Sequence, residues 1–171
     1  MNKTLGACCL AALLAAPALA IDMTPLQIGI WGPGIQLFPE QTKVMGLRLN
    51  VAGSDNQEVM GVDIGLVSQA DRMDAIQLNL ANRVDAEFTG ISAGLFNQMG
   101  SVSGLQAGLF NNVAHDMNGF QFGLFNVADD VAGFQVGLIN RTVSMRGVQI
   151  GLVNLIESGP VTFFPILNAA F

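Results

Sequence analysis

Residues 104–111, Gly-Leu-Gln-Ala-Gly-Leu-Phe-Asn, decide the fold because near copies of this segment recur along the chain. Gly-Phe-Gln-Phe-Gly-Leu-Phe-Asn follows at 119–126, and Gly-Phe-Gln-Val-Gly-Leu-Ile-Asn at 133–140. Related units are spaced by fourteen or fifteen residues and begin at Gly46, Gly61, Ala75, Gly90, Gly104, Gly119, Gly133 and Gly147. Self-similarity at a fixed short period is typical of stacked repeat proteins.

Within a unit, numbered from its first residue, positions two, four and six are apolar, as in Phe120, Phe122 and Leu124. This alternation has the period of a strand. Position three is usually Gln, position five Gly and position eight Asn. A second apolar pair lies near positions ten and thirteen, for example Met99 with Val102. Each unit therefore has two apolar stretches separated by a polar corner.

Such a unit cannot bury an apolar face alone, but units stacked about 4.8 Å apart pair their backbones and align like residues. The sequence therefore predicts an all-β protein, a β-solenoid of about 14-residue coils with positions two, four and six inside. The Asn at position eight is expected to adopt left-handed backbone at a corner of the coil. The amides of stacked Asn residues are expected to hydrogen-bond to one another along the column. Gly is expected to provide conformational freedom at position one. At position five, its lack of a side chain is expected to leave the outer face of the strand without one.

A small outer-membrane β-barrel is the alternative fold. A membrane-spanning strand of 9 to 11 residues with a short turn also uses about fourteen residues, and its Gln and Gly positions would face the interior. The chain ends in the aromatic Phe171. However, it has one Trp and no Tyr for interfacial girdles, and antiparallel neighbours would not share one pattern. The solenoid is the favoured prediction.

Residues 1–20 have the features of an export signal: Lys3, an apolar run over 5–14, and small residues ending at Ala20. Cleavage there would remove both cysteines of the chain. Prolines near both ends separate the rest of the chain into three segments. We expect an N-terminal cap over 21–45, a repeat array over 46–160 and a C-terminal cap over 161–171.

Composition limits the functions to consider. The chain has 51% hydrophobic residues and a formal net charge of -6, which excludes intrinsic disorder and argues against nucleic-acid binding. His115 is the only histidine, and the acidic residues are scattered. The sequence therefore predicts no catalytic, cofactor-binding or metal-binding residues and no cofactor, so we expect a protein that is not an enzyme. A carbohydrate-active enzyme using the scattered acids is a less favoured alternative.

The tandem units occur with Ile-Gln-Leu-Phe-Pro-Glu at 35–40, Gly-Leu-Arg-Leu-Asn at 46–50 and Phe-Phe-Pro-Ile-Leu-Asn at 163–168. In these features the chain resembles bacterial surface-repeat-containing proteins, exported repeat proteins without an assigned activity. The resemblance covers about residues 35–171. It implies export through the inner membrane to the periplasm, outer membrane or cell surface, and it supplies no catalytic residues.

Position seven supplies the candidate interaction stripe. Because it lies on the strand face opposite positions two, four and six, it is expected to point outward beside Gly and Gln columns, as a contact for a protein or an envelope surface. Alternatively, a corner turns these side chains inward or the caps cover them. The stripe consists of Phe96, Phe110, Phe125, Ile139 and Val153. The predicted function is that of an exported, non-enzymatic structural or interaction module of the cell envelope. The sequence does not identify the partner of this module, which can be a protein, an envelope surface or a membrane.

Overall fold

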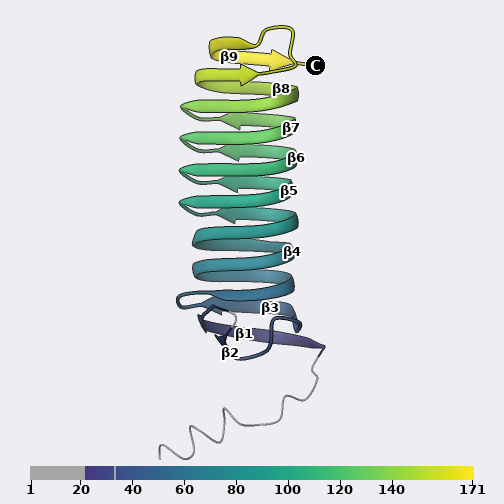
Figure 1. Ribbon diagram of the computed structural model, residues 1–171, viewed down its shortest axis with the longest axis vertical. Helices are drawn as coiled ribbons and strands as arrows, with labels where there is room; N and C mark the ends of the chain where they lie inside the picture. The colour runs from purple at the N-terminus through teal and green to yellow at the C-terminus, as the bar shows by residue number, and fades with distance from the viewer. Residues whose placement is uncertain (1–21, 33) are drawn as a thin grey trace, which may run out of the picture.

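The computed structural model describes residues 22–32 and 34–171, and the predicted export signal over 1–20 lies outside this range. In Figure 1 the described chain forms one column of stacked coils. Within this range no helix is long and apolar enough to cross a membrane. The strands are β1 (Met23–Trp31), β2 (Ile35–Gln36), β3 (Lys43–Asn50), β4 (Ser54–Ala93), β5 (Phe96–Ala107), β6 (Phe110–Phe122), β7 (Phe125–Val136), β8 (Ile139–Ile156) and β9 (Phe163–Ala170).

Successive coils from β3 to β8 pair in parallel, each with the next coil along the chain. The register places like residues side by side: Gly104 pairs with Gly119 and Asn111 with Asn126. The column has about eight turns of about 14 residues. This confirms the predicted β-solenoid and excludes the barrel alternative, in which neighbouring strands would be antiparallel.

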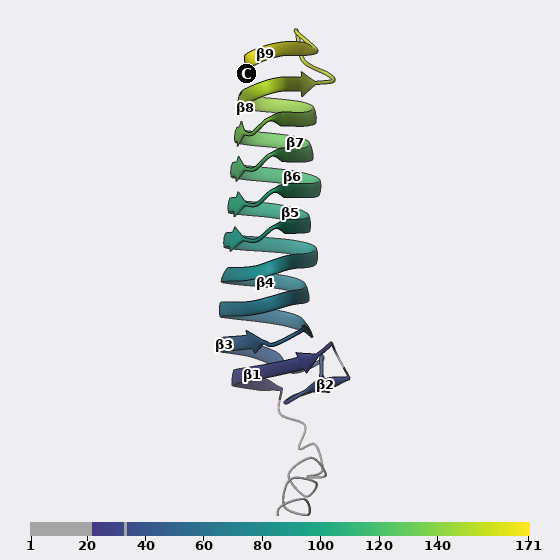
Figure 2. The ribbon, with the colours of Figure 1, turned by 90° about the vertical axis from the view of Figure 1, so that its left-hand side faces the viewer.

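Each coil is a flattened loop with two different edges (Figures 1 and 2). At the narrow edge the strand is interrupted at positions five and six between β4 and β8, as at Gly108 and Leu109, whereas it continues through these positions within β4 and at the last coil in β8. At the rounded edge the strand continues through positions eleven and twelve. There, the register between β5 and β6 shifts: Met99 pairs with Val113 and Val102 with Met117, so β6 accommodates one extra residue. Since such a bulge absorbs an insertion locally, both faces keep their register.

The prediction that positions two, four and six face the core is wrong. Phe120 at position two is 46% exposed, whereas Gln121 beside it is fully buried. The reason is the small space inside the narrow edge: a Cβ on Gly108 would lie 2.5 Å from Nδ2 of Asn97. Leucine and phenylalanine side chains cannot fit there, so the Gly and Gln positions face inward and the apolar positions outward.

The apolar core lies in the other half of each coil, toward the rounded edge. It includes the position-ten and position-thirteen side chains of most coils: Val84, Met99, Val102, Val113, Ala128, Val131 and Met145. In the coil that begins at Gly133, position ten is Thr142, and the apolar residue next to it, Val143, is exposed. Thr142 takes the buried place, and its hydroxyl oxygen lies 2.8 Å from the backbone carbonyl oxygens of Asp129 and Ser144, which share its one donor hydrogen.

The glycines at positions one and five have different roles. Gly119 at position one has φ of 130°, and a Cβ there would lie 2.1 Å from the carbonyl oxygen of Gly104. The predicted conformational role at position one is therefore confirmed. At position five the prediction of a bare outer face is wrong, because the missing side chain would point into the stack, as Gly108 shows. The Asn at position eight is also not in left-handed backbone, since Ile166 is the one non-Gly residue with positive φ in the described chain.

Antiparallel strands lie at both ends of the stack. β9 pairs with β8 from Gly147 to Leu155, whereas the two-residue β2 pairs only with Gly29 and Trp31 of β1. β9 therefore occupies edge hydrogen-bonding groups of the last coil that would favour end-to-end association, and β2 occupies those at one end of β1.

Gly119→Ala should lower the free energy of unfolding by at least about 1–3 kcal/mol, because the added methyl group meets a carbonyl in backbone that L-residues rarely adopt. The matched control is Gly34→Ala, since a Cβ at Gly34 has no neighbour within 4 Å. Chemical denaturation followed by circular dichroism measures both. Equal midpoints for the two variants would contradict the assigned role of position one.

Candidate apolar contact surface

The outward side chains at positions two, four, six and seven form one continuous apolar band around the narrow edge. We name this surface the apolar band. No Asp, Glu, Lys or Arg occupies any of these positions from Leu47 to Val153. The exposed large members are Leu47, Leu49, Val51, Ile64, Leu66, Val67, Ile76, Leu78, Leu80, Ile91, Leu95, Phe96, Leu109, Phe110, Phe120, Phe122, Leu124, Phe125, Phe134, Leu138, Ile150 and Leu152. A contiguous exposed apolar surface of this extent is rare on soluble monomeric proteins.

The predicted stripe at position seven lies in one column within this band. Phe96, Phe110 and Phe125 are exposed, and Ile139 and Val153 are half-buried. The ring centroids of Phe96 and Phe110 are 5.3 Å apart, and those of Phe110 and Phe125 are 4.9 Å apart, with nearly parallel planes. The Gln column expected beside the stripe is buried instead. The role of the stripe in binding stays a prediction.

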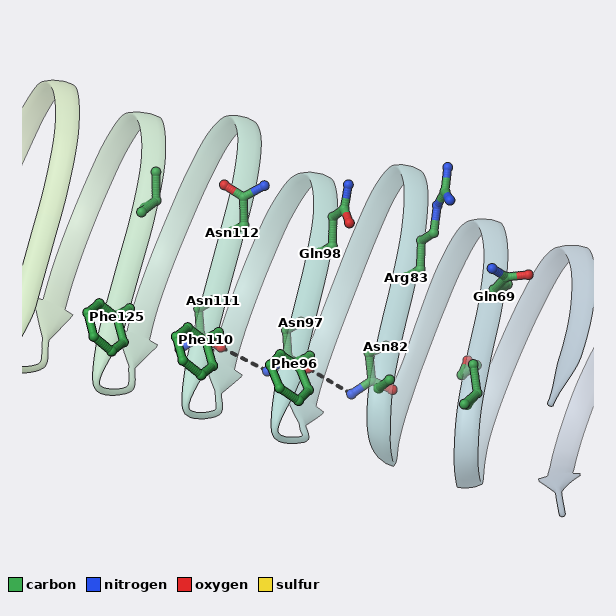
Figure 3. Close-up of a pocket in the computed structure, with 14 residues that line it drawn as sticks. Gln69, Asn82, Arg83, Phe96, Asn97, Gln98, Phe110, Asn111, Asn112 and Phe125 are labelled. Atoms are coloured by element: carbon green, nitrogen blue, oxygen red, sulfur yellow. Dashed lines mark hydrogen bonds between the residues drawn. The ribbon is translucent and has the colours of Figure 1, made fainter. Parts of the chain in front are cut away.

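A shallow groove of about 390 Å³ runs beside the phenylalanine column. Figure 3 shows Phe96, Phe110 and Phe125 in a row near the narrow turns, with Gln98 and Asn112 further along the same strands. The buried position-eight asparagines lie between these two rows. The phenylalanine column borders one side of the groove, and a mostly polar column, which includes Gln98, Asn112 and Val127, borders the other. The groove therefore marks one boundary of the apolar band.

The asparagines beneath the groove form a continuous amide ladder, as the sequence predicted. Nδ2 of Asn97 donates to Oδ1 of Asn111 at 2.8 Å, and Nδ2 of Asn111 donates to Oδ1 of Asn126 at 2.8 Å. The same amide of Asn111 also donates to the backbone carbonyl of Phe122 at 2.7 Å. The ladder extends over Asn82, Asn97, Asn111, Asn126, Asn140 and Asn154. It therefore joins the two faces of each coil as well as successive coils.

A second amide ladder runs through position three. Nε2 of Gln121 donates to Oε1 of Gln106 at 2.9 Å, and Nε2 of Gln135 donates to Oε1 of Gln121 at 2.8 Å. These donors point toward the preceding coil, whereas the asparagine donors point toward the following one. The two parallel columns thus have opposed side-chain dipoles. Their hydrogen bonds satisfy buried polar groups within the columns, while Nε2 of Gln106 and Oε1 of Gln149, at the two ends of the glutamine ladder, lack a partner among the residues that the structure describes.

In the first coils a buried ion pair replaces glutamine at position three. Arg48 and Asp63 are fully buried, with Nε to Oδ1 at 2.8 Å and Nη2 to Oδ2 at 3.1 Å. Burial alone would raise the pKa of Asp63, but the Arg48 charge and hydrogen bonds from Arg48, Ser68 and Asn50 hold it below its ordinary value. Asn79 also donates to Asp63, so the carboxylate is enclosed by donors.

The sequence contains a signal for the inward direction of position three, which the apolar alternation alone does not give. Arg48 and Asp63 stand at the same position in consecutive units, and Gln77 follows in the next. Opposite charges that stack one coil apart can neutralise each other inside the column, whereas a solvent-facing column needs no such pairing. This placement indicates that position three faces inward and that positions two and four face outward.

Charged residues of the repeat coils gather away from the apolar band. Apart from the Arg48–Asp63 pair, they occupy positions nine to fourteen, and acidic residues predominate. His115 lies among them and is exposed. In the described part of the chain, no three His, Cys, Asp or Glu residues are grouped as metal ligands would be. The molecule is therefore amphipathic, with a polar rounded edge and an apolar narrow edge.

No protein-family model matches the chain, and neither a curated protein nor a solved structure matches it. The apolar band is therefore defined by its geometry and its residues alone.

Asn111→Ala should lower the free energy of unfolding by roughly 2 kcal/mol or more, because it removes three buried hydrogen bonds: one accepted from the Asn97 amide, one donated to Oδ1 of Asn126 and one donated to the carbonyl of Phe122. The neighbouring Asn112 is exposed, so Asn112→Ala is the matched control and should stay within about 0.5 kcal/mol of the unsubstituted protein. Urea denaturation compares them. An equal loss in both variants would show that the ladder adds no stability.

The lowered pKa of Asp63 predicts a pH dependence of stability. Its contribution should be complete above about pH 4 and disappear as the pH falls through the lowered pKa of the folded state. Asp63→Asn should cost about 3–5 kcal/mol at pH 7, because Arg48 stays buried without its partner. The stability difference between this variant and the unsubstituted protein should shrink on acidification.

Denaturation midpoints between pH 2 and 7 measure this difference. Asp71→Asn, which alters an exposed carboxylate, is the control. A stability difference for Asp63→Asn that is the same at pH 2 and pH 7 would contradict the assigned ion pair.

Proposed function

We propose that this protein is an exported, non-enzymatic interaction module of the cell envelope, and that the apolar band is its contact surface. The β-solenoid supplies a rigid column on which identical positions recur at each coil. In this role the fold presents a surface rather than holding a reaction centre. Its partner belongs to the periplasm, the outer membrane or the cell surface.

The observation that carries the proposal is the segregation of exposed residues. The apolar band contains no charged residue, while the charged side chains of the repeat coils, apart from the buried Arg48–Asp63 pair, occupy positions nine to fourteen. A stability requirement does not explain this arrangement, because the band lies outside the core and its exposed side chains face solvent in the isolated chain. Exposing apolar surface of this size is costly in water unless a partner covers it.

The sequence supports the location. Residues 1–20 have the pattern of an export signal, and the repeat units with their flanking segments resemble those of bacterial surface-repeat-containing proteins. We propose membership of that family together with its envelope location. Caps over 21–45 and 161–171 would bound the repeat array over 46–160.

Phe110→Asp should move the protein from the envelope fraction to the soluble fraction of cells that express the full chain. A charge at the centre of the phenylalanine column opposes burial against an apolar partner. The matched control is Asn112→Asp, which adds the same charge on the same strand outside the apolar band. Quantitative immunoblotting of the fractions measures both.

Asn112→Asp should unfold within about 0.5 kcal/mol of the unsubstituted protein, because its side chain is exposed. Phe110→Asp should lose about 1–3 kcal/mol, because it removes the ring contacts with Phe96 and Phe125, but it should still fold. Failure of Phe110→Asp to fold would show that the ring belongs to the core. If both variants fold and distribute alike, the apolar band is not the envelope contact and the proposed function fails.

A further inference from the structure

We infer that the partner of the apolar band is lipid hydrocarbon, and that the narrow edge of the solenoid penetrates one leaflet of a membrane. This inference rests on the proposed function and names its partner. Three observations favour lipid over a second copy or another folded protein: the convex shape of the band, the backbone bonding at the narrow turns and the position of the charges.

The band is convex. Within one coil, Phe122 at position four lies on one face, Leu124 at position six on the narrow turn, and Phe125 at position seven on the other face. All three are exposed. A flat partner, such as the face of a second copy, covers one of these surfaces and leaves the others in water. Fluid hydrocarbon surrounds a narrow edge and covers both faces together.

The narrow turns also meet the main requirement for entering lipid, which is that backbone groups find partners without water. In one coil, the N–H groups of Leu109 and Phe110 both donate to the carbonyl of Leu95, at 3.0 and 2.9 Å. The N–H of Gly108 donates to the carbonyl of Phe122 at 2.9 Å. These bonds run between coils, so they persist when the edge leaves water.

The interior beneath the apolar band has the opposite polarity to its surface. Buried Gln and Asn amides bond to one another there, while leucine and phenylalanine face outward. Proteins that cross lipid with strands use this same distribution, with apolar residues toward the hydrocarbon and polar residues inside. A soluble protein that binds another protein has no need to place apolar residues outside at four positions of every coil.

The charges determine which lipid surface is suitable. Acidic residues predominate on the rounded edge, and the apolar band carries no basic side chain. Hydrophobic burial must therefore drive the contact, without attraction to anionic headgroups. Binding should be at least as strong to phosphatidylcholine as to vesicles that also contain phosphatidylglycerol, and it should persist in about 0.5 M salt, in which charge interactions are screened.

The test uses protein purified from cells that express the full chain, mixed with phosphatidylcholine vesicles and floated on a density gradient. The unsubstituted protein should float with the vesicles. The Leu109→Glu/Leu124→Glu variant should show an apparent lipid affinity at least tenfold weaker, since it puts charges at the part of the edge that enters hydrocarbon. The control is Ala114→Glu/His115→Glu, which adds the same number of carboxylates to exposed positions on the rounded edge and should float like the unsubstituted protein.

A second measurement reports depth. Leu124→Trp in a Trp31→Phe background places the one tryptophan of the chain on the narrow turn. Vesicles with bromine on the acyl chains should quench its fluorescence strongly, whereas the same substitution at His115 should remain unquenched. Equal quenching at the two sites would overturn insertion by the narrow edge.

The remaining outcomes separate the two proposals. If the protein does not float but forms dimers that Leu109→Glu/Leu124→Glu dissociates, a second copy covers the band. The lipid inference then fails and the contact surface stands. If neither flotation nor self-association responds to this variant and Phe110→Asp does not alter the cell fraction, the proposed function fails as well.

Discussion

The in-register stacking of one coil on the next is the constraint on which the structure depends. Parallel pairing brings every residue beside its counterpart in the neighbouring unit, so each side chain must be compatible with a copy of itself about 4.8 Å away. Asparagine and glutamine meet this condition inside the column because an amide both donates and accepts a hydrogen bond. Phenylalanine meets it outside, where rings stack along the column. The buried ion pair of Arg48 and Asp63 satisfies it by charge complementarity instead of identity.

The narrow edge converts this constraint into an amphipathic molecule. Its two faces lie too close together for large side chains, and the amide ladders fill the space between them. The apolar residues of positions two, four and six must then face outward. At the rounded edge the faces enclose Met, Val and Phe side chains, and charged residues lie outside. The proposed contact surface is therefore a direct consequence of how the coil is closed, and the lipid inference extends the same geometry to its environment.

The repeat, its length, the strand period and the asparagine ladder were all predictable from the sequence, because each depends on spacing and on residue type. The glycine at position one was predictable in the same way, and its positive φ explains it. The direction of the alternation does not follow from its period. A strand with period two has two faces, and the rule that the apolar face forms the core, which usually holds in water, fails here. Phe96, Phe110 and Phe125 at position seven are exposed as expected, but the position-three glutamines expected beside them are buried.

Spacing and residue type specify that like residues stack at intervals of fourteen or fifteen, that strands form the coils and that no charge enters positions two, four, six or seven. Which of these residues are buried depends on the folded coil, because burial follows from the distance between its two faces. That distance is set where the chain turns. Gly108 and Asn97 lie close enough at the narrow edge to exclude any larger side chain. Local periodicity contains no information on this approach, because it arises from residues on opposite faces of the coil.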